Sequence, residues 1–115
     1  MNPAQAAVGD SAARGANPLR GEASIHVNGR EVLLRPTFDA LVRAEEDLGP
    51  LFALVERAGE GKLRLAEIAT LFWHCLAQPG ALTRDDVGEA VMDAGLAACA
   101  RPLRTLLGAI LQGSS

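Results

Sequence analysis

The chain has 115 residues, of which 49% are hydrophobic and 22% are charged, so it has the size and composition of one soluble globular domain rather than of a disordered chain. Its formal net charge of -3 provides no positive field to attract nucleic acid or an anionic membrane. No apolar run approaches the roughly 20 residues that a membrane-spanning helix needs. We therefore expect neither nucleic acid nor a membrane as a partner.

Residues 1–18 combine Ala, Gly, Asn and Pro with scattered charges and show no apolar periodicity, which predicts a flexible N-terminal arm. A single domain is expected over 19–112. The first residues lack the basic start and compact apolar stretch of a secretory signal. Cys75 and Cys99 lie far apart in apolar contexts. We therefore expect a cytoplasmic protein whose two thiols are buried and free.

The first regular element is indicated by Asn28-Gly29, which separates the alternating segments 23–27 and 30–34. An Asn-Gly pair favours a type I′ turn, because both central residues of that turn need positive φ. The pattern predicts a β-hairpin over 22–35. A lone hairpin is only marginally stable in water, so its apolar face should rest on helices.

A two-residue turn also fixes how the two strands pair. The expected pairs are Val27 with Arg30, His26 with Glu31, Ile25 with Val32, and Ala23 with Leu34. The odd-numbered residues of the first strand then share an apolar face with Val32 and Leu34. On the opposite face, His26 and Glu31 are expected to form a cross-strand ion pair.

Helices should form the rest of the chain. Apolar periodicity and breaker residues predict them over 38–48, 51–58, 65–77, 84–94 and 96–111. Thr37 and Thr83 are suited to cap two of them, and Pro102 should kink or restart the last. The expected fold class is α+β and mostly helical, an N-terminal β-hairpin followed by four or five short helices. Its predicted core comprises Ile25, Val32, Leu34, Phe38, Leu41, Leu54, Ile68, Phe72, Leu76, Leu103 and Leu107.

No group of reactive side chains has the spacing of an active site. The carboxylates at 45–47 and 85–86 are sequence neighbours, so on a helix they diverge instead of converging on one atom. His74 and Cys75 splay apart for the same reason, and no zinc-type spacing occurs. The segment Gly59-Glu60-Gly61-Lys62 lacks both the length of a phosphate-binding loop and the Ser or Thr that ends one. We therefore expect no enzyme, no catalytic residue, no metal and no cofactor.

Leu71 and Trp73 fall outside the apolar stripe of the 65–77 segment. One interpretation buries Trp73 partly under the hairpin or a neighbouring helix, as is usual for this residue type. The other leaves it exposed as an anchor for another protein, and exposed apolar area of that kind marks protein contacts. Leu71 and Trp73 are therefore the candidate partner-binding residues.

Several segments together carry a family resemblance. They are Asn17-Pro18-Leu19-Arg20-Gly21-Glu22, Phe38-Asp39-Ala40-Leu41, Glu45-Glu46-Asp47-Leu48-Gly49, Gly61-Lys62-Leu63-Arg64-Leu65-Ala66-Glu67-Ile68 and Leu82-Thr83-Arg84-Asp85-Asp86-Val87-Gly88. With the hairpin between the first two, they resemble small tail proteins of alphaproteobacterial gene transfer agents and siphophages. These are grouped as phage tail assembly chaperones, and some are labelled tail tube proteins. The resemblance spans about 17–111, and Arg64 departs from the small capping residue expected at its position.

The resemblance implies a non-enzymatic role in tail assembly. Such chaperones act in the cytoplasm of the producing bacterium and coat the tape-measure protein before tail tube subunits polymerise around it. The tape-measure protein is then the expected partner, and the tube subunits are a further candidate. The main alternative is a structural tail (tube) component retained in the particle, although a tube subunit normally needs more β-sheet than one hairpin. A third alternative, a small regulatory or DNA-binding helical protein, is disfavoured by the acidic balance and the scattered arginines.

Overall fold

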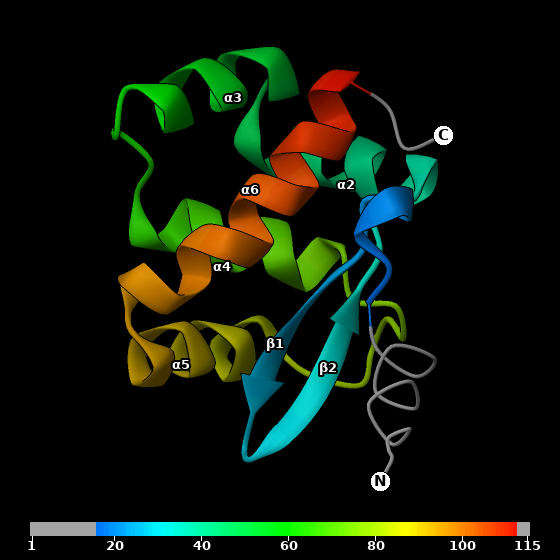
Figure 1. Ribbon diagram of the computed structural model, residues 1–115, viewed down its shortest axis with the longest axis vertical. Helices are drawn as coiled ribbons and strands as arrows, with labels where there is room; N and C mark the ends of the chain where they lie inside the picture. The colour runs from blue at the N-terminus through cyan, green and yellow to red at the C-terminus, as the bar shows by residue number, and fades with distance from the viewer. Residues whose placement is uncertain (1–15, 113–115) are drawn as a thin grey trace, which may run out of the picture.

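The computed structural model describes residues 16–112. In chain order the elements are η1 (Pro18–Arg20), β1 (Ala23–Val27), β2 (Arg30–Leu34), α2 (Phe38–Leu48), α3 (Leu51–Gly59), α4 (Leu65–His74), α5 (Arg84–Ala94) and α6 (Leu96–Gln112). A hairpin followed by five helices confirms the expected α+β, mostly helical class (Figure 1). Of the arm predicted over 1–18, residues 1–15 lie outside the described residues, and Pro18 begins η1.

The hairpin has the predicted register, with Val27 opposite Arg30 and Ile25 opposite Val32. Asn28 and Gly29 have φ values of 54° and 78°, the left-handed conformations that a type I′ turn requires. The predicted ion pair between His26 and Glu31 is wrong. The Glu31 carboxylate instead accepts a hydrogen bond from the Ser24 hydroxyl, 2.8 Å away on the same face of the hairpin.

Helix α4 lies at the centre of the helical layer, where it packs against α2 on one side and α5 on the other (Figure 1). Its residues Ile68, Ala69, Thr70, Leu71 and Phe72 are all buried. The hairpin rests on α5 and α6 through β1, and α6 also reaches α3. One continuous core therefore joins every layer, and most of the predicted core residues lie in it: Ile25, Leu34, Leu54, Ile68, Phe72, Leu76 and Leu107.

Phe38 is the clear error in the predicted core, because its side chain is 84% exposed. Helix α2 buries the face that carries Ala40 and Ala44. Phe38 lies about 200° around the helix from Ala40 and therefore points to solvent. Val32, Leu41 and Leu103, also predicted to be core, are only partly buried where they pack against it.

Helix α4 ends at His74, three residues before the predicted end, because the following backbone pairs with β2. The Arg35 amide donates to the Cys75 carbonyl at 2.6 Å, and the Ala77 amide donates to the Leu33 carbonyl at 3.0 Å. The apolar pattern continues past His74, but these residues satisfy their backbone groups on a strand rather than in a helical turn.

Helix α4 begins without a small capping side chain. At this end the Glu67 carboxylate accepts a hydrogen bond from the Arg64 amide at 2.9 Å, as the last residue of a capping box does. The other Glu67 carboxylate oxygen binds the Arg57 guanidinium of α3. Glu67 therefore both caps α4 and ties it to α3.

Helix α6 runs without interruption through Pro102, so a restart at this residue does not occur. Proline removes the amide that would bond the Ala98 carbonyl four residues earlier. Ala98 is exposed, so water can satisfy that carbonyl. Within residues 16–112, no helix combines the length and the apolar character that crossing a bilayer requires.

Candidate protein-binding surfaces

Leu71 does not lie on a free face of α4. Its side chain is 0% exposed, so the expectation that it falls outside the core is wrong. The cause is the position of α4 between α2 and α5, since a helix packed on both sides buries apolar residues around most of its circumference.

Trp73 is half-buried and engaged within the chain. Its indole Nε1 donates a hydrogen bond to the Leu82 carbonyl at 3.0 Å. The Arg84 guanidinium lies 4.8 Å from the centre of the indole ring, a cation–π geometry. Trp73 thereby fastens the connection between α4 and α5, which agrees with the interpretation that it is partly buried against its neighbours.

A charged cluster beside Trp73 joins three helices. The Asp47 carboxylate of α2 lies 2.7 Å from His74 Nε2 of α4 and 3.2 Å from Arg84 Nη2 of α5. The hydrogen bond with His74, assisted by the charge of Arg84, lowers the pKa of Asp47 below its ordinary value. The cluster therefore links α2 to both α4 and α5.

The two thiols are free and buried. Burial raises the pKa of Cys75 to about 12 and also raises the pKa of Cys99. A thiol is nucleophilic only as its thiolate, so neither cysteine is activated for covalent chemistry. Among residues 16–112, no group of three or more His, Cys, Asp or Glu side chains is arranged to hold a metal ion.

Two exposed phenylalanine side chains, Phe38 and Phe52, line a groove between α2, α3 and the end of α6. We call it the aromatic groove. Its lining residues are Phe38, Leu41, Val42, Glu45, Leu51, Phe52, Val55, Ile110 and Leu111, and they enclose about 450 Å³. Phe52 is 65% exposed, and with Phe38 it makes two of the three phenylalanines of the chain surface residues. Exposed aromatics clustered in this way are typical of protein interfaces.

A hydrogen bond joins two residues that line the aromatic groove. The Glu45 carboxylate near the end of α2 accepts a hydrogen bond from the Leu51 amide at 3.1 Å. Pro50, which precedes α3, offers no side-chain cap, so Glu45 satisfies one of the free amides at this helix start. The carboxylate thereby joins the end of α2 to the start of α3, beside the groove.

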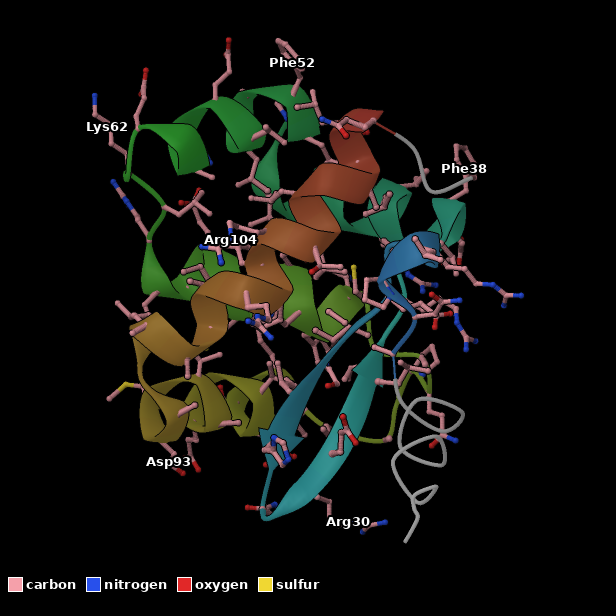
Figure 2. The ribbon with its side chains drawn as sticks, in the orientation of Figure 1. Arg30, Phe38, Phe52, Lys62, Asp93 and Arg104 are labelled. Carbon is pink, nitrogen blue, oxygen red and sulfur yellow. The ribbon has the colours of Figure 1, made fainter. Side chains whose placement is uncertain are left out.

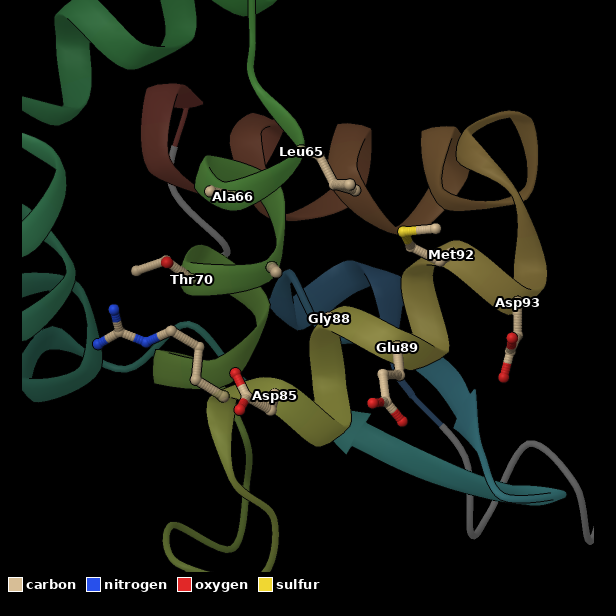
Figure 3. A pocket seen from close by; sticks show the side chains of 10 residues that line it. Leu65, Ala66, Thr70, Asp85, Gly88, Glu89, Met92 and Asp93 are labelled. Carbon is tan, nitrogen blue, oxygen red and sulfur yellow. The ribbon is translucent and has the colours of Figure 1, made fainter.

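A second groove lies between α4 and α5 (Figure 3). We call it the acidic groove. It encloses about 550 Å³ and is lined by Leu65, Ala66, Ala69, Thr70, Arg84, Asp85, Gly88, Glu89, Met92 and Asp93. Leu65 is 40% exposed here, and Met92 is 66% exposed. Figure 2 shows Phe38 and Phe52 at one end of the molecule and Asp93 at the other.

In both grooves, an apolar residue that lies off the buried face of its helix is visible in the sequence. Phe52 lies off the stripe that Leu51, Leu54 and Val55 form on α3, as Met92 lies off the buried face of α5. The structure does not bring the predicted pair, Leu71 and Trp73, together at either groove. Trp73 is linked to the acidic groove through Arg84, which lies on its ring and also lines that groove.

A comparison with protein families matches residues 20–113 to the family described as phage tail tube protein, GTA-gp10. The match covers most of the chain, and the chain belongs to this family of phage tail proteins. No curated protein and no solved structure matches it.

Proposed function

We propose that this protein is a non-enzymatic tail assembly chaperone that binds the tape-measure protein through the aromatic groove. The observation that carries the proposal is the concentration of exposed aromatic and aliphatic side chains in one groove, with Phe38 and Phe52 at the surface. Family membership supports a role among tail proteins. The chaperone would act in the cytoplasm of the producing cell.

A tape-measure protein is long and helical, and an amphipathic helix binds a partner by laying its apolar face into a groove. The aromatic groove has apolar walls from three helices. Burying one large apolar side chain contributes about 1.5–3 kcal/mol. Phe38 and Phe52 together therefore offer enough apolar area to anchor such a helix.

The test is binding of a helical tape-measure fragment from the same gene cluster, measured by titration calorimetry. Phe52→Ala should weaken binding at least about tenfold, the effect of an interface hot spot. Leu96→Ala is the matched control, because Leu96 is similarly exposed but lies outside the groove. Equal affinities of the two variants, each with an unchanged circular dichroism spectrum, would contradict the proposed site.

A contribution of Trp73 to partner binding remains a prediction, and Trp73→Phe belongs in the same titration. This variant keeps an aromatic ring but loses the hydrogen bond to the Leu82 carbonyl. Leu71 has no exposed surface, so it could act only by supporting α4.

The alternative is a structural tail (tube) component retained in the particle, and the family description as a tail tube protein favours it. Against it, the sheet among the described residues has two strands, whereas a ring-forming tube subunit normally relies on more extended sheet. Mass spectrometry of purified particles discriminates the two functions. Recovery in ring-like stoichiometry supports the tube component. Presence in the lysate with the tape-measure protein, and absence from particles, supports the chaperone.

A further inference from the structure

The acidic groove combines an apolar floor with one strongly charged edge. Leu65 and Met92 provide exposed apolar area, and the small residues between them include Gly88. A Cβ added at Gly88 would lie 3.9 Å from the Ala69 Cβ, an ordinary contact distance, so α5 lies close to α4 at this point of the floor. Small residues on a helix surface allow another backbone to approach closely.

Three carboxylates follow the groove along α5. Asp85, Glu89 and Asp93 are spaced four residues apart, so they form one row on the helix surface (Figure 3). No salt bridge among the described residues involves any of them. The one cation that lines the groove, Arg84, already pairs with Asp47 and lies on Trp73.

This row is unfavourable for α5 itself. Like charges four residues apart on a helix repel each other. Asp93 lies in the last turn, where the helix dipole disfavours a negative charge, and that turn contains no basic residue. Asp85 lies in the first turn, where the helix dipole favours its charge. The repulsion within the row and the position of Asp93 nevertheless cost the isolated protein stability, and a positively charged partner would relieve that cost.

We propose that the acidic groove binds an amphipathic helix whose apolar stripe is flanked by Lys or Arg residues at four-residue spacing. The apolar stripe would cover Leu65 and Met92, while the cations would face Asp85, Glu89 and Asp93 at steps of about 6 Å. Methionine adapts its shape to an incoming side chain, which suits such a contact. The proposal is independent of the aromatic groove, which lies at the other end of the molecule.

The test uses two fluorescein-labelled synthetic helical peptides of about 18 residues, which is five helical turns. Both carry the same leucine stripe, flanked in one by lysines at positions i, i+4 and i+8 and in the other by glutamates. Fluorescence anisotropy with the full chain should give a dissociation constant at least about tenfold lower for the basic peptide. The difference should shrink as salt rises, because salt screens exposed charges.

Glu89→Lys should weaken binding of the basic peptide at least about tenfold, and Glu89→Gln should weaken it less. Glu46→Lys is the matched control, because Glu46 is an exposed helical glutamate outside both grooves. It should change the affinity less than about twofold. Because a leucine stripe could also bind the aromatic groove, the titrations are repeated in the Phe52→Ala background. The preference for the basic peptide should persist there, so this test does not depend on the proposed function.

Three outcomes of the peptide titrations would overturn the proposal. They are equal affinity for the two peptides, no binding of the basic peptide, and an equal loss in the Glu46→Lys variant, which would indicate general attraction to an acidic protein. A second copy of the chain is another occupant that the groove could bind. Light scattering of the free protein measures whether it forms such a dimer. A dimer that Glu89→Lys dissociates would assign the groove to a second copy and would likewise overturn it.

Discussion

Glu22 joins the chain before the hairpin to the chain after it. One carboxylate oxygen accepts a hydrogen bond from the Asn17 amide at 3.1 Å, and the other accepts one from Arg35 Nε at 2.9 Å. The residue is only 6% exposed. Burial raises the pKa of Glu22, but the hydrogen bonds from Arg35 and the Asn17 amide outweigh this effect, so the pKa lies below its ordinary value.

Glu22→Gln should therefore lower the free energy of unfolding by about 1–2 kcal/mol at pH 7. Because the folded-state pKa is depressed, the ionised carboxylate stabilises the fold fully above the unfolded pKa of about 4.3. That contribution is lost as the pH falls through the folded-state pKa. Urea titrations from pH 7 down to pH 3 should show the difference between wild type and variant shrinking. A difference that is independent of pH would refute the assigned ion pair.

The buried thiols give a second expectation at this scale. At pH 8 almost none of Cys75 is thiolate, because its pKa is about 12, and Cys99 is shielded by burial. A chromogenic disulfide reagent should therefore leave both thiols of the native protein unmodified over minutes. In guanidinium chloride it should modify both rapidly. Fast modification of the native protein would show that α4 or α6 opens locally.

The two misplaced apolar residues, Phe38 and Leu71, share one cause. Apolar periodicity gives the shape of a stripe but not the number of neighbours around a helix, so it predicts the wrong environment for both residues. Leu71 is buried since α4 is packed on both sides, whereas Phe38 is exposed since α2 buries a face of small residues. Both facts depend on tertiary packing.

At the scale of elements, the starts of the hairpin and of two helices were predictable because their signals are local. Thr37 and Thr83 accept hydrogen bonds from the third residue of each helix, at 3.1 and 3.0 Å. The end of α4 was not predictable, because residues after His74 pair with a strand some 40 positions earlier in the chain. Long-range backbone pairing leaves no local sequence pattern.

The turn of the hairpin provides a matched pair of glycine substitutions. Gly29→Ala should destabilise the protein by about 1–2 kcal/mol, because φ is 78° at this position. Gly59→Ala places the same methyl group at the end of α3, where no atom lies within 4 Å of it, so it should be neutral or slightly stabilising. Urea unfolding measures both. Equal effects would mean that backbone conformation at the turn does not limit stability.

At the scale of the whole molecule, α6 holds the layers together, since it contacts β1, α5 and α3. Leu106 is fully buried within it. Leu106→Ala should lower the free energy of unfolding by about 2–5 kcal/mol. Trp73 fluorescence and far-ultraviolet circular dichroism should report the same shifted midpoint, because one core unfolds cooperatively. Separate midpoints for the two signals would instead divide the molecule into two folding units.

The candidate surfaces were only partly predictable from sequence at this scale. The sequence shows apolar residues that lie outside the buried stripes of its helices, and it shows acidic residues at the start of α5. The location of a groove depends on which helices meet, and here α2 and α3 meet the end of α6, which follows them by some 50 to 70 residues. No periodicity within a single helix contains that information.

Grooves at opposite ends would make the domain bivalent. Once a helix occupied one of them, a second helix of the same long partner would reach the other groove as an intramolecular step. Its effective concentration would then be set by the connecting chain rather than by the solution. Two individually weak contacts would thus give strong retention that releases quickly when either is displaced. The proposed chaperone, which would bind a long polypeptide and later release it, needs that kinetic behaviour.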